Sequence, residues 1–84
     1  MFKRNPQYIW EEIENICYLF NTEDSSSIDL NEIASEIWLA IESKSSDEIA
    51  EDLLSKYSVE KDILVNDIKA FIDQALQIGI IIQL

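Results

Sequence analysis

Apolar residues recur with helical spacing in the middle of the chain. Between residues 28 and 41 they fall at i, i+3, i+4, i+7, i+8 and i+11, as Leu30, Ile33, Ala34, Ile37, Trp38 and Ile41. This spacing predicts an amphipathic helix with one wide apolar stripe. Asn31 stands where an N-cap belongs, because its short side chain can accept a hydrogen bond from an unpaired backbone N–H of the first turn.

Two more helices are predicted in the second half. The second begins with the capping box Ser45-x-x-Glu48. Its expected buried face consists of Ile49, Ala50, Leu53, Leu54 and Tyr57. Ser58 is the expected cap of a third helix of about five turns that ends near Ile78. Its main stripe is Leu64, Ile68, Phe71, Ile72, Ala75 and Leu76, and Gly79 follows at the C′ position, where a positive φ costs little.

The first third of the chain permits two interpretations. Ile9, Trp10, Ile13, Ile16, Cys17 and Phe20 fit a helical stripe, with Pro6 as the first helical residue behind an Asn5 cap. The alternative is a hairpin of strands 7–13 and 16–21 joined by Glu14-Asn15, since Ile-Cys-Tyr-Leu-Phe is rich in strand-favouring residues. Periodicity alone slightly favours the helix. Residues 1–6 are expected to form a loose arm, and Ile80-Ile81-Ile82 to form a short strand or pack over the core.

Length and composition limit the possible functions. Eighty-four residues suffice for one small domain, and 48% hydrophobic residues argue against disorder. The formal net charge of −11, from 17 acidic and 6 basic residues, opposes binding to nucleic acid or to anionic lipid. No signal peptide or membrane-spanning run is visible, so we expect a cytoplasmic protein that is not bound to a membrane.

The chemistry-bearing residues do not predict an enzyme. The chain has no histidine, and its lone Cys17 is expected to be a small buried hydrophobe. Glu11-Glu12 and Glu23-Asp24 are the closest acidic pairs, but no other ligand type accompanies them. We interpret them as solvated surface residues and expect no catalytic residue, no metal site and no cofactor.

Several segments together resemble the PqqD-like family, the peptide-binding modules called RiPP recognition elements. Leu30-Asn31-Glu32-Ile33-Ala34, closing on Ile37-Trp38, is similar to the family's Leu-Asn-x-x-Ala-x-x-Ile-Trp/Leu run. The segment from Asp47 to Tyr57 resembles its second helix, which ends in tyrosine. Asp67-Ile68-Lys69-Ala70-Phe71-Ile72, followed by Gly79-Ile80, resembles its third. The resemblance covers roughly residues 7 to 82, and the order and separation of these segments make it moderately specific.

The resemblance implies a fold and a function. The fold would be α+β, a small winged helix-turn-helix-like domain in which a three-stranded antiparallel sheet precedes three α-helices. Residues 7–20 would then be the hairpin, which we adopt, and residues 27–30 the third strand. The function would be to bind the leader segment of a ribosomally made precursor peptide and present it to a separate modifying enzyme of a PQQ-, lasso- or thioether-type pathway. We expect a monomer or weak dimer.

In the family, the leader adds as a strand beside the third strand and against the third helix. Carried onto this chain, the strand edge is Ser26, Ser27, Ile28, Asp29 and Leu30, and the helix wall is Lys61, Leu64, Val65, Ile68, Lys69 and Ile72. Leu64 and Ile68 lie on the central stripe and are better explained as core. Val65 and Ile72 sit at the edge of the stripe and are the better groove candidates. Lys61 and Lys69 are either solvated or paired with acidic leader residues.

Two other classes compete with peptide binding. An acyl carrier protein is also small, acidic and helical, and Ser25 or Ser27 would be its attachment site. The residues around these serines match the family's Asp-Ser-Leu/Ile pattern poorly. A winged-helix DNA binder would share the fold, but Lys61 and Lys69 are outnumbered by acidic residues on the third helix.

Overall fold

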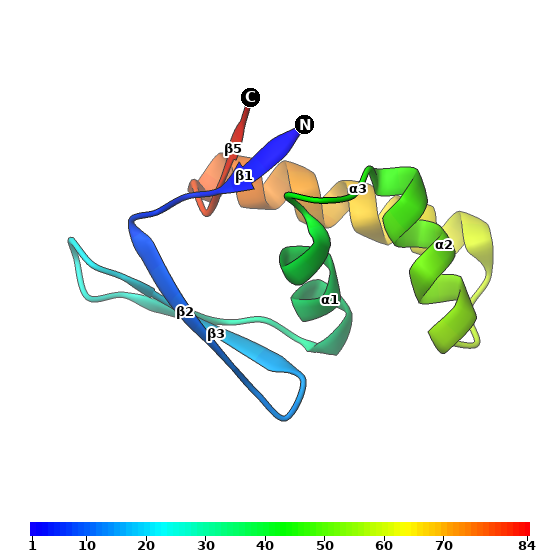
Figure 1. Cartoon of the computed structure of the whole chain (residues 1–84), viewed down its shortest axis with the longest axis horizontal. Coiled ribbons are helices and arrows are strands. Elements are labelled where there is room, and N and C mark those ends of the chain that lie inside the picture. The colour runs from blue at the N-terminus through cyan, green and yellow to red at the C-terminus, as the bar shows by residue number, and fades with distance from the viewer.

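The computed structural model describes residues 1–84 and contains three helices and two small sheets (Figure 1). The elements in chain order are β1 (Phe2–Arg4), β2 (Tyr8–Ile13), β3 (Ile16–Asn21), β4 (Ser27–Asp29), α1 (Glu32–Ala40), α2 (Ser46–Lys56), α3 (Lys61–Ile78) and β5 (Ile81–Gln83). One antiparallel sheet has the order β2-β3-β4, and β1 pairs with β5 in the other. The predicted α+β fold, with a three-stranded antiparallel sheet before three helices, is confirmed.

Residues 7–20 form the hairpin and not the helix. β2 and β3 pair from Tyr8 opposite Asn21 to Ile13 opposite Ile16. Glu14 and Asn15 connect them with φ values of 51° and 69°. Positive φ at both central residues is the geometry of the two-residue turn whose twist matches that of paired strands. The carrier-protein interpretation, which requires a helix here, is therefore wrong.

The helix ends show which sequence signals are realised. Asn31 Oδ1 accepts a hydrogen bond from Ala34 N–H at 2.8 Å, and the capping box of Ser45 and Glu48 is complete. Gly79 ends α3 with a φ of 87°, as predicted. The expected cap at Ser58 is wrong, because α3 begins two residues later behind Glu60, whose side chain makes no capping bond.

The expectation of a loose N-terminal arm is also wrong. Phe2–Arg4 forms β1, and the two chain ends lie side by side because β1 pairs with β5 (Figure 1). The Arg4 guanidinium donates to the carbonyl oxygens of Trp38 and Leu39 at 3.0 and 3.3 Å. It thereby satisfies free carbonyls at the end of α1, where the helix has no basic residue of its own. It also lies 5.0 Å from the Trp10 ring centroid and 5.7 Å from that of Trp38.

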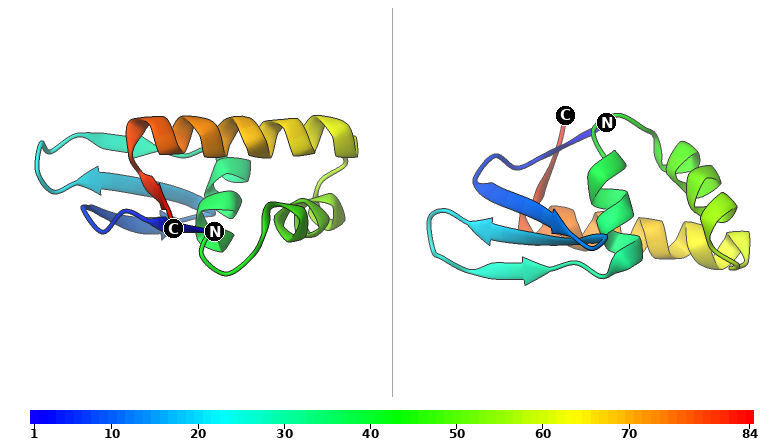
Figure 2. Two further views of the ribbon diagram at one scale, coloured as in Figure 1. Left: turned by 90° about the horizontal axis from the view of Figure 1, so that it is seen from above. Right: turned by 60° about the horizontal axis from the view of Figure 1, so that its bottom comes forward.

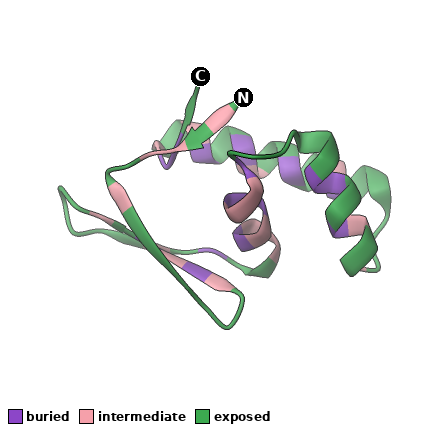
Figure 3. Ribbon diagram, in the orientation of Figure 1, coloured by how far each residue is buried: buried purple, intermediate pink, exposed green.

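The core is a single cluster of 15 buried apolar residues that joins the inner side of the sheet to all three helices (Figures 2 and 3). From the sheet it contains Cys17 and Leu19, and Leu30 follows β4. From the helices, and from Ile41 directly after α1, it contains Ile37, Trp38, Ile41, Ile49, Ala50, Leu53, Leu64, Ile68, Ile72 and Ala75, and after α3 it is completed by Ile80 and Ile81. Most predicted stripe positions are therefore buried. Ser35 is the one buried polar residue, and its hydroxyl accepts from Cys17 N–H and donates to the Leu30 carbonyl.

Candidate functional site

β4 leaves one backbone edge of the sheet open. β4 pairs with β3 alone, through Tyr18 opposite Asp29, Leu19 opposite Ile28 and Phe20 opposite Ser27. Just beyond this ladder, Leu30 N–H donates to the Cys17 carbonyl and Asn21 N–H donates to the Ser26 carbonyl, both at 2.9 Å. In an antiparallel pair, inward and outward backbone groups alternate along the strand. Ile28 therefore directs its N–H and C=O toward β3, whereas Ser27 and Asp29 direct theirs to the open edge.

A trough runs along this edge, between β4 with the start of α1 on one side and α3 on the other. One part has a volume of about 220 Å³ and is lined by Ile28, Asp29, Leu30, Asn31, Ala34, Phe71, Gln74, Ala75, Ile78 and Ile80. An adjoining hollow of about 390 Å³ shares four of these residues and adds Ile33, Ile37, Asp67 and Ala70. We call the two together the β4–α3 trough. It offers apolar side chains directly beside unpaired backbone groups.

The predicted strand edge lies at this trough, since Ile28, Asp29 and Leu30 line it. Ser26 and Ser27 are exposed beside it. On the helix, by contrast, Leu64, Ile68 and Ile72 are buried in the core, and Ile72 is only 8% exposed. Ile72 lines a separate hollow with Phe2 and Ile41, away from β4, and its part in a peptide groove stays a prediction.

The rest of the predicted helix wall faces away from β4. Val65 and Lys69 border a small hollow with Ser46 and Asp47 at the start of α2. Lys61 is exposed and pairs with Glu51 of α2 at 3.5 Å. The structure therefore does not bring the predicted edge and the predicted wall together. The helix residues beside β4 are instead Phe71, Gln74, Ala75 and Ile78, and Asp67 and Ala70 extend the trough against the first half of α1.

Ile78 is the trough residue that the sequence analysis could most readily have identified as a candidate binding residue. It is apolar and 48% exposed, and it lies outside the stripe that packs into the core. The charges at the trough are negative, from Asp29 and Asp67, and neither carboxylate forms an ion pair. The trough therefore favours an extended segment with apolar side chains at alternate positions and basic groups near its rim.

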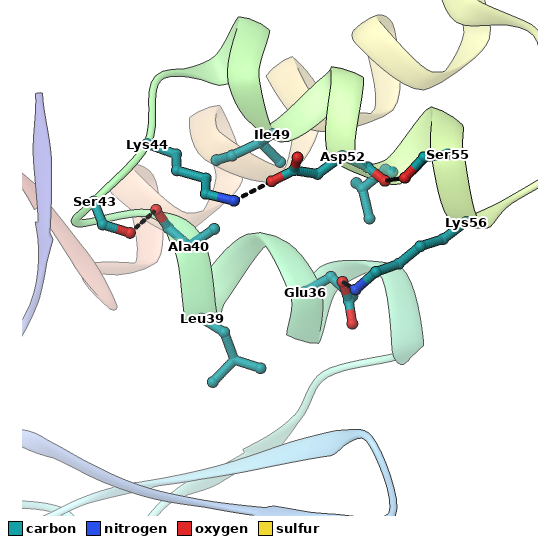
Figure 4. A pocket seen from close by; sticks show the side chains of 10 residues that line it. Glu36, Leu39, Ala40, Ser43, Lys44, Ile49, Asp52, Ser55 and Lys56 are labelled. Carbon is teal, nitrogen blue, oxygen red and sulfur yellow. Dashed lines mark hydrogen bonds and ion pairs between the residues drawn. The ribbon is translucent and has the colours of Figure 1, made fainter.

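Another hollow lies between α1 and α2, with a volume of about 490 Å³ (Figure 4). Leu39, Ala40, Ile49 and Leu53 supply its apolar lining. Two ion pairs link its walls: Lys44 with Asp52, and Lys56 with Glu36 at 2.7 Å. The hydrogen bond from Lys56 to Glu36 raises the pKa of that lysine. Because its charged groups already pair with one another, this hollow is better explained as a contact between α1 and α2 held by ion pairs than as a ligand site.

Other residues singled out from the sequence have structural roles. Cys17 is completely buried, as expected, and burial raises the pKa of its thiol. Glu11, Glu12, Glu23 and Asp24 are exposed. Nowhere do three or more His, Cys, Asp or Glu side chains lie together in a way that could hold a metal ion. None of the three helices has the length and hydropathy of a membrane span.

Comparisons with known proteins agree with this architecture. TbiB1 in complex with the TbiA(beta) leader peptide is 21% identical, with 94% of this chain and 93% of that chain covered and a TM-score of 0.83. Lasso peptide synthetase B1 complexed with the leader peptide is 20% identical, with 98% of each chain covered and a TM-score of 0.85. No curated protein matches the sequence. The model of the family described as coenzyme PQQ synthesis protein D (PqqD) matches residues 17–81, and the chain therefore belongs to the PqqD family.

Proposed function

We propose that this protein binds the leader segment of a ribosomally made precursor peptide and holds it for a separate modifying enzyme. The observation that carries the proposal is the position of the open β4 edge beside the apolar β4–α3 trough. Main-chain bonds from an added strand supply affinity, and hollows for alternate side chains supply specificity. The two structural neighbours were both solved with leader peptides, which supports the same use of the fold here.

The trough defines the bound segment. A strand that pairs with the outward groups of Ser27 and Asp29 turns alternate side chains toward Phe71 and Ile78. We propose that these positions in the leader are apolar and that a basic residue lies near Asp29 or Asp67. A lasso-type pathway is the first candidate because one neighbour is a lasso peptide synthetase B1.

The protein itself performs no chemistry in this proposal. The trough places apolar side chains, two amides and two carboxylates around the peptide, with no nucleophile beside a base. The modifying step belongs to the partner enzyme, and the protein acts in the cytoplasm, where precursor peptides are made.

The proposal is tested by titrating a fluorescent leader peptide of the pathway's precursor against the parent and two matched variants. Ile78 and Ile63 are both exposed isoleucines of α3, but only Ile78 lines the trough. Ile78→Ala should weaken binding by about 1–2 kcal/mol, or roughly 5–30-fold, and Ile63→Ala should leave it unchanged.

A labelled DNA duplex at low salt provides the counter-test, because non-specific nucleic-acid binding is strongest there. The charge of −11 predicts no binding to the duplex. Tight duplex binding, or equal effects of the two alanine variants on leader binding, would reject the proposal.

A further inference from the structure

The side of the three-stranded sheet that faces away from the helices is unusually apolar. Cys17 and Leu19 of β3 are fully buried, so the alternate residues Ile16, Tyr18 and Phe20 point to the opposite side. Directly paired residues share a face, and Ile9 is opposite Phe20 while Ile13 is opposite Ile16. We call these five residues, Ile9, Ile13, Ile16, Tyr18 and Phe20, the outer face.

No helix of the chain covers the outer face. The helices pack on the other side of the sheet, where Trp10 meets Trp38 of α1 with their ring centroids 6.1 Å apart. On the outer face Ile9 is 59%, Ile13 50% and Phe20 44% exposed. A solvated face of an antiparallel sheet is normally polar, and a contiguous exposed apolar patch marks an interaction surface.

A row of polar groups crosses the middle of this face. Tyr18 is opposite Glu11 on β2 and opposite Asp29 on β4, so two carboxylates flank its ring. Both acidic residues are exposed, and neither forms an ion pair within the chain. A guanidinium or ammonium placed over Tyr18 would meet the ring face and both carboxylates.

The surrounding charge selects the kind of partner. Residues 5–43, which contain the whole three-stranded sheet, include nine Asp or Glu and no Lys or Arg. Only Glu36 and Glu42 among them form an ion pair with a basic residue elsewhere in the chain. A second copy of this chain would bring the same excess of negative charge, and like charges oppose each other across an interface. The charge therefore favours a different protein with a basic surface.

We propose that the outer face docks a partner protein that presents apolar side chains around an arginine or lysine, which sits over Tyr18 between Glu11 and Asp29. Resting on the function proposed above, this partner is the modifying enzyme of the pathway. Ile28 lies at the β4–α3 trough, whereas Ile9, Ile13 and Phe20 point to the other side of the sheet. With the basic residue of the leader at Asp67, the leader and the enzyme can therefore be bound at the same time.

The test uses purified modifying enzyme of the pathway and measures its Kd, alongside the Kd for the leader peptide. The double variant Ile9→Thr/Phe20→Thr keeps strand-favouring residues but removes apolar surface. Ile63→Thr on α3 is the control for loss of an exposed isoleucine. Glu11→Lys tests the charge, with Asp73→Lys, an exposed carboxylate of α3, as its control. Asp29 is left unchanged because it borders both surfaces.

We expect the double variant to raise the enzyme Kd at least tenfold and Glu11→Lys to raise it at least threefold. The leader Kd should stay within twofold of the parent, and both control variants should behave like the parent. Unchanged enzyme binding in the outer-face variants would overturn the inference. So would sedimentation showing a parent dimer that the double variant dissociates, because the face would then serve self-association.

The two proposals fail in different ways. If the parent does not bind the leader, the proposed function fails, while the enzyme Kd values still decide whether the outer face is a docking surface. If the leader binds but the outer-face variants retain enzyme affinity, only the docking inference fails.

Discussion

The backbone register of β4 predicts opposite behaviour for proline at two neighbouring positions. Proline removes a backbone N–H, so its effect depends on where that group points. The N–H of Ile28 lies on the side of β4 that pairs with β3, and the N–H of Ser27 lies on the open edge. Ile28→Pro should therefore damage the fold, and Ser27→Pro should damage leader binding.

The magnitudes follow from the hydrogen bonds. Ile28→Pro breaks a bond of the ladder and leaves the Leu19 carbonyl without a partner, which costs about 1–3 kcal/mol. For a domain of this size that corresponds to a Tm lower by roughly 4–8 °C for each kcal/mol. Ile28 also packs against the core. Ile28→Ala therefore measures separately how much stability is lost with the side chain alone. Ser27 is exposed, and its replacement should change stability by about 0.5 kcal/mol or less.

For leader binding the order should be the reverse, with Ser27→Pro causing the larger loss of affinity and Ile28→Pro the smaller. Ser27→Pro removes one donor to the leader and leaves a leader carbonyl unpaired, a loss of about 1–3 kcal/mol, or roughly 5–150-fold in Kd. A melting curve and a leader titration for each variant provide the data. If Ser27→Pro unfolds as readily as Ile28→Pro, the inferred register is wrong. If both variants stay folded and bind like the parent, the leader does not dock on β4.

Two further predictions concern stability. Ser35→Ala should lower the free energy of unfolding by about 1–3 kcal/mol in urea titrations, because it leaves the Cys17 N–H without its acceptor. The control, Ser43→Ala at an exposed turn, should change the free energy of unfolding little, and equal effects would contradict the assigned role of Ser35. The hydrogen bonds from Ser45 hold the pKa of the Glu48 carboxyl below its usual value. The ionised carboxylate therefore stabilises the fold above its unfolded-state pKa, and this stabilisation is lost as the pH falls through the lower folded-state pKa. The Tm difference between the parent and Glu48→Gln should therefore shrink from pH 6 to pH 3, and a constant difference would argue against this linkage.

Local signals predicted most of the fold. The caps at Asn31 and Ser45 and the glycine after α3 act within a few residues of their own positions, so the sequence alone identifies them. The hairpin was harder to predict, because the spacing of its apolar residues slightly favours a helix. That spacing arises because both faces of the sheet are apolar: Trp10 and Cys17 lie on the inner side, and Ile9, Ile13 and Phe20 on the outer.

Long-range pairing explains what the sequence did not reveal at the chain ends. Residues 2–4 contain no strand pattern of their own, and they are ordered by β5, about 80 positions away. Arg4 adds contacts to Trp10 and to the end of α1 that depend on the same distant pairing. Neither the pairing of β1 with β5 nor the contacts of Arg4 can be recognised from the residues near position 4. For this reason the sequence alone suggested a loose arm.

The predicted helix wall and the β4–α3 trough lie on different flanks of α3, for a geometric reason. Successive residues of an α-helix are about 100° apart, so Leu64, Ile68, Ile72 and Ala75 form one narrow buried arc. Val65 and Lys69 lie on one flank of that arc, and Phe71, Gln74 and Ile78 lie on the other. Each flank carries apolar residues, so periodicity cannot decide which one borders β4. That choice depends on where β4 runs relative to α3, and β4 leads directly into α1, whose first turn lies against Phe71 and Gln74. The trough therefore follows from the packing of α1 on α3, a tertiary relation that the pattern of either helix alone does not contain.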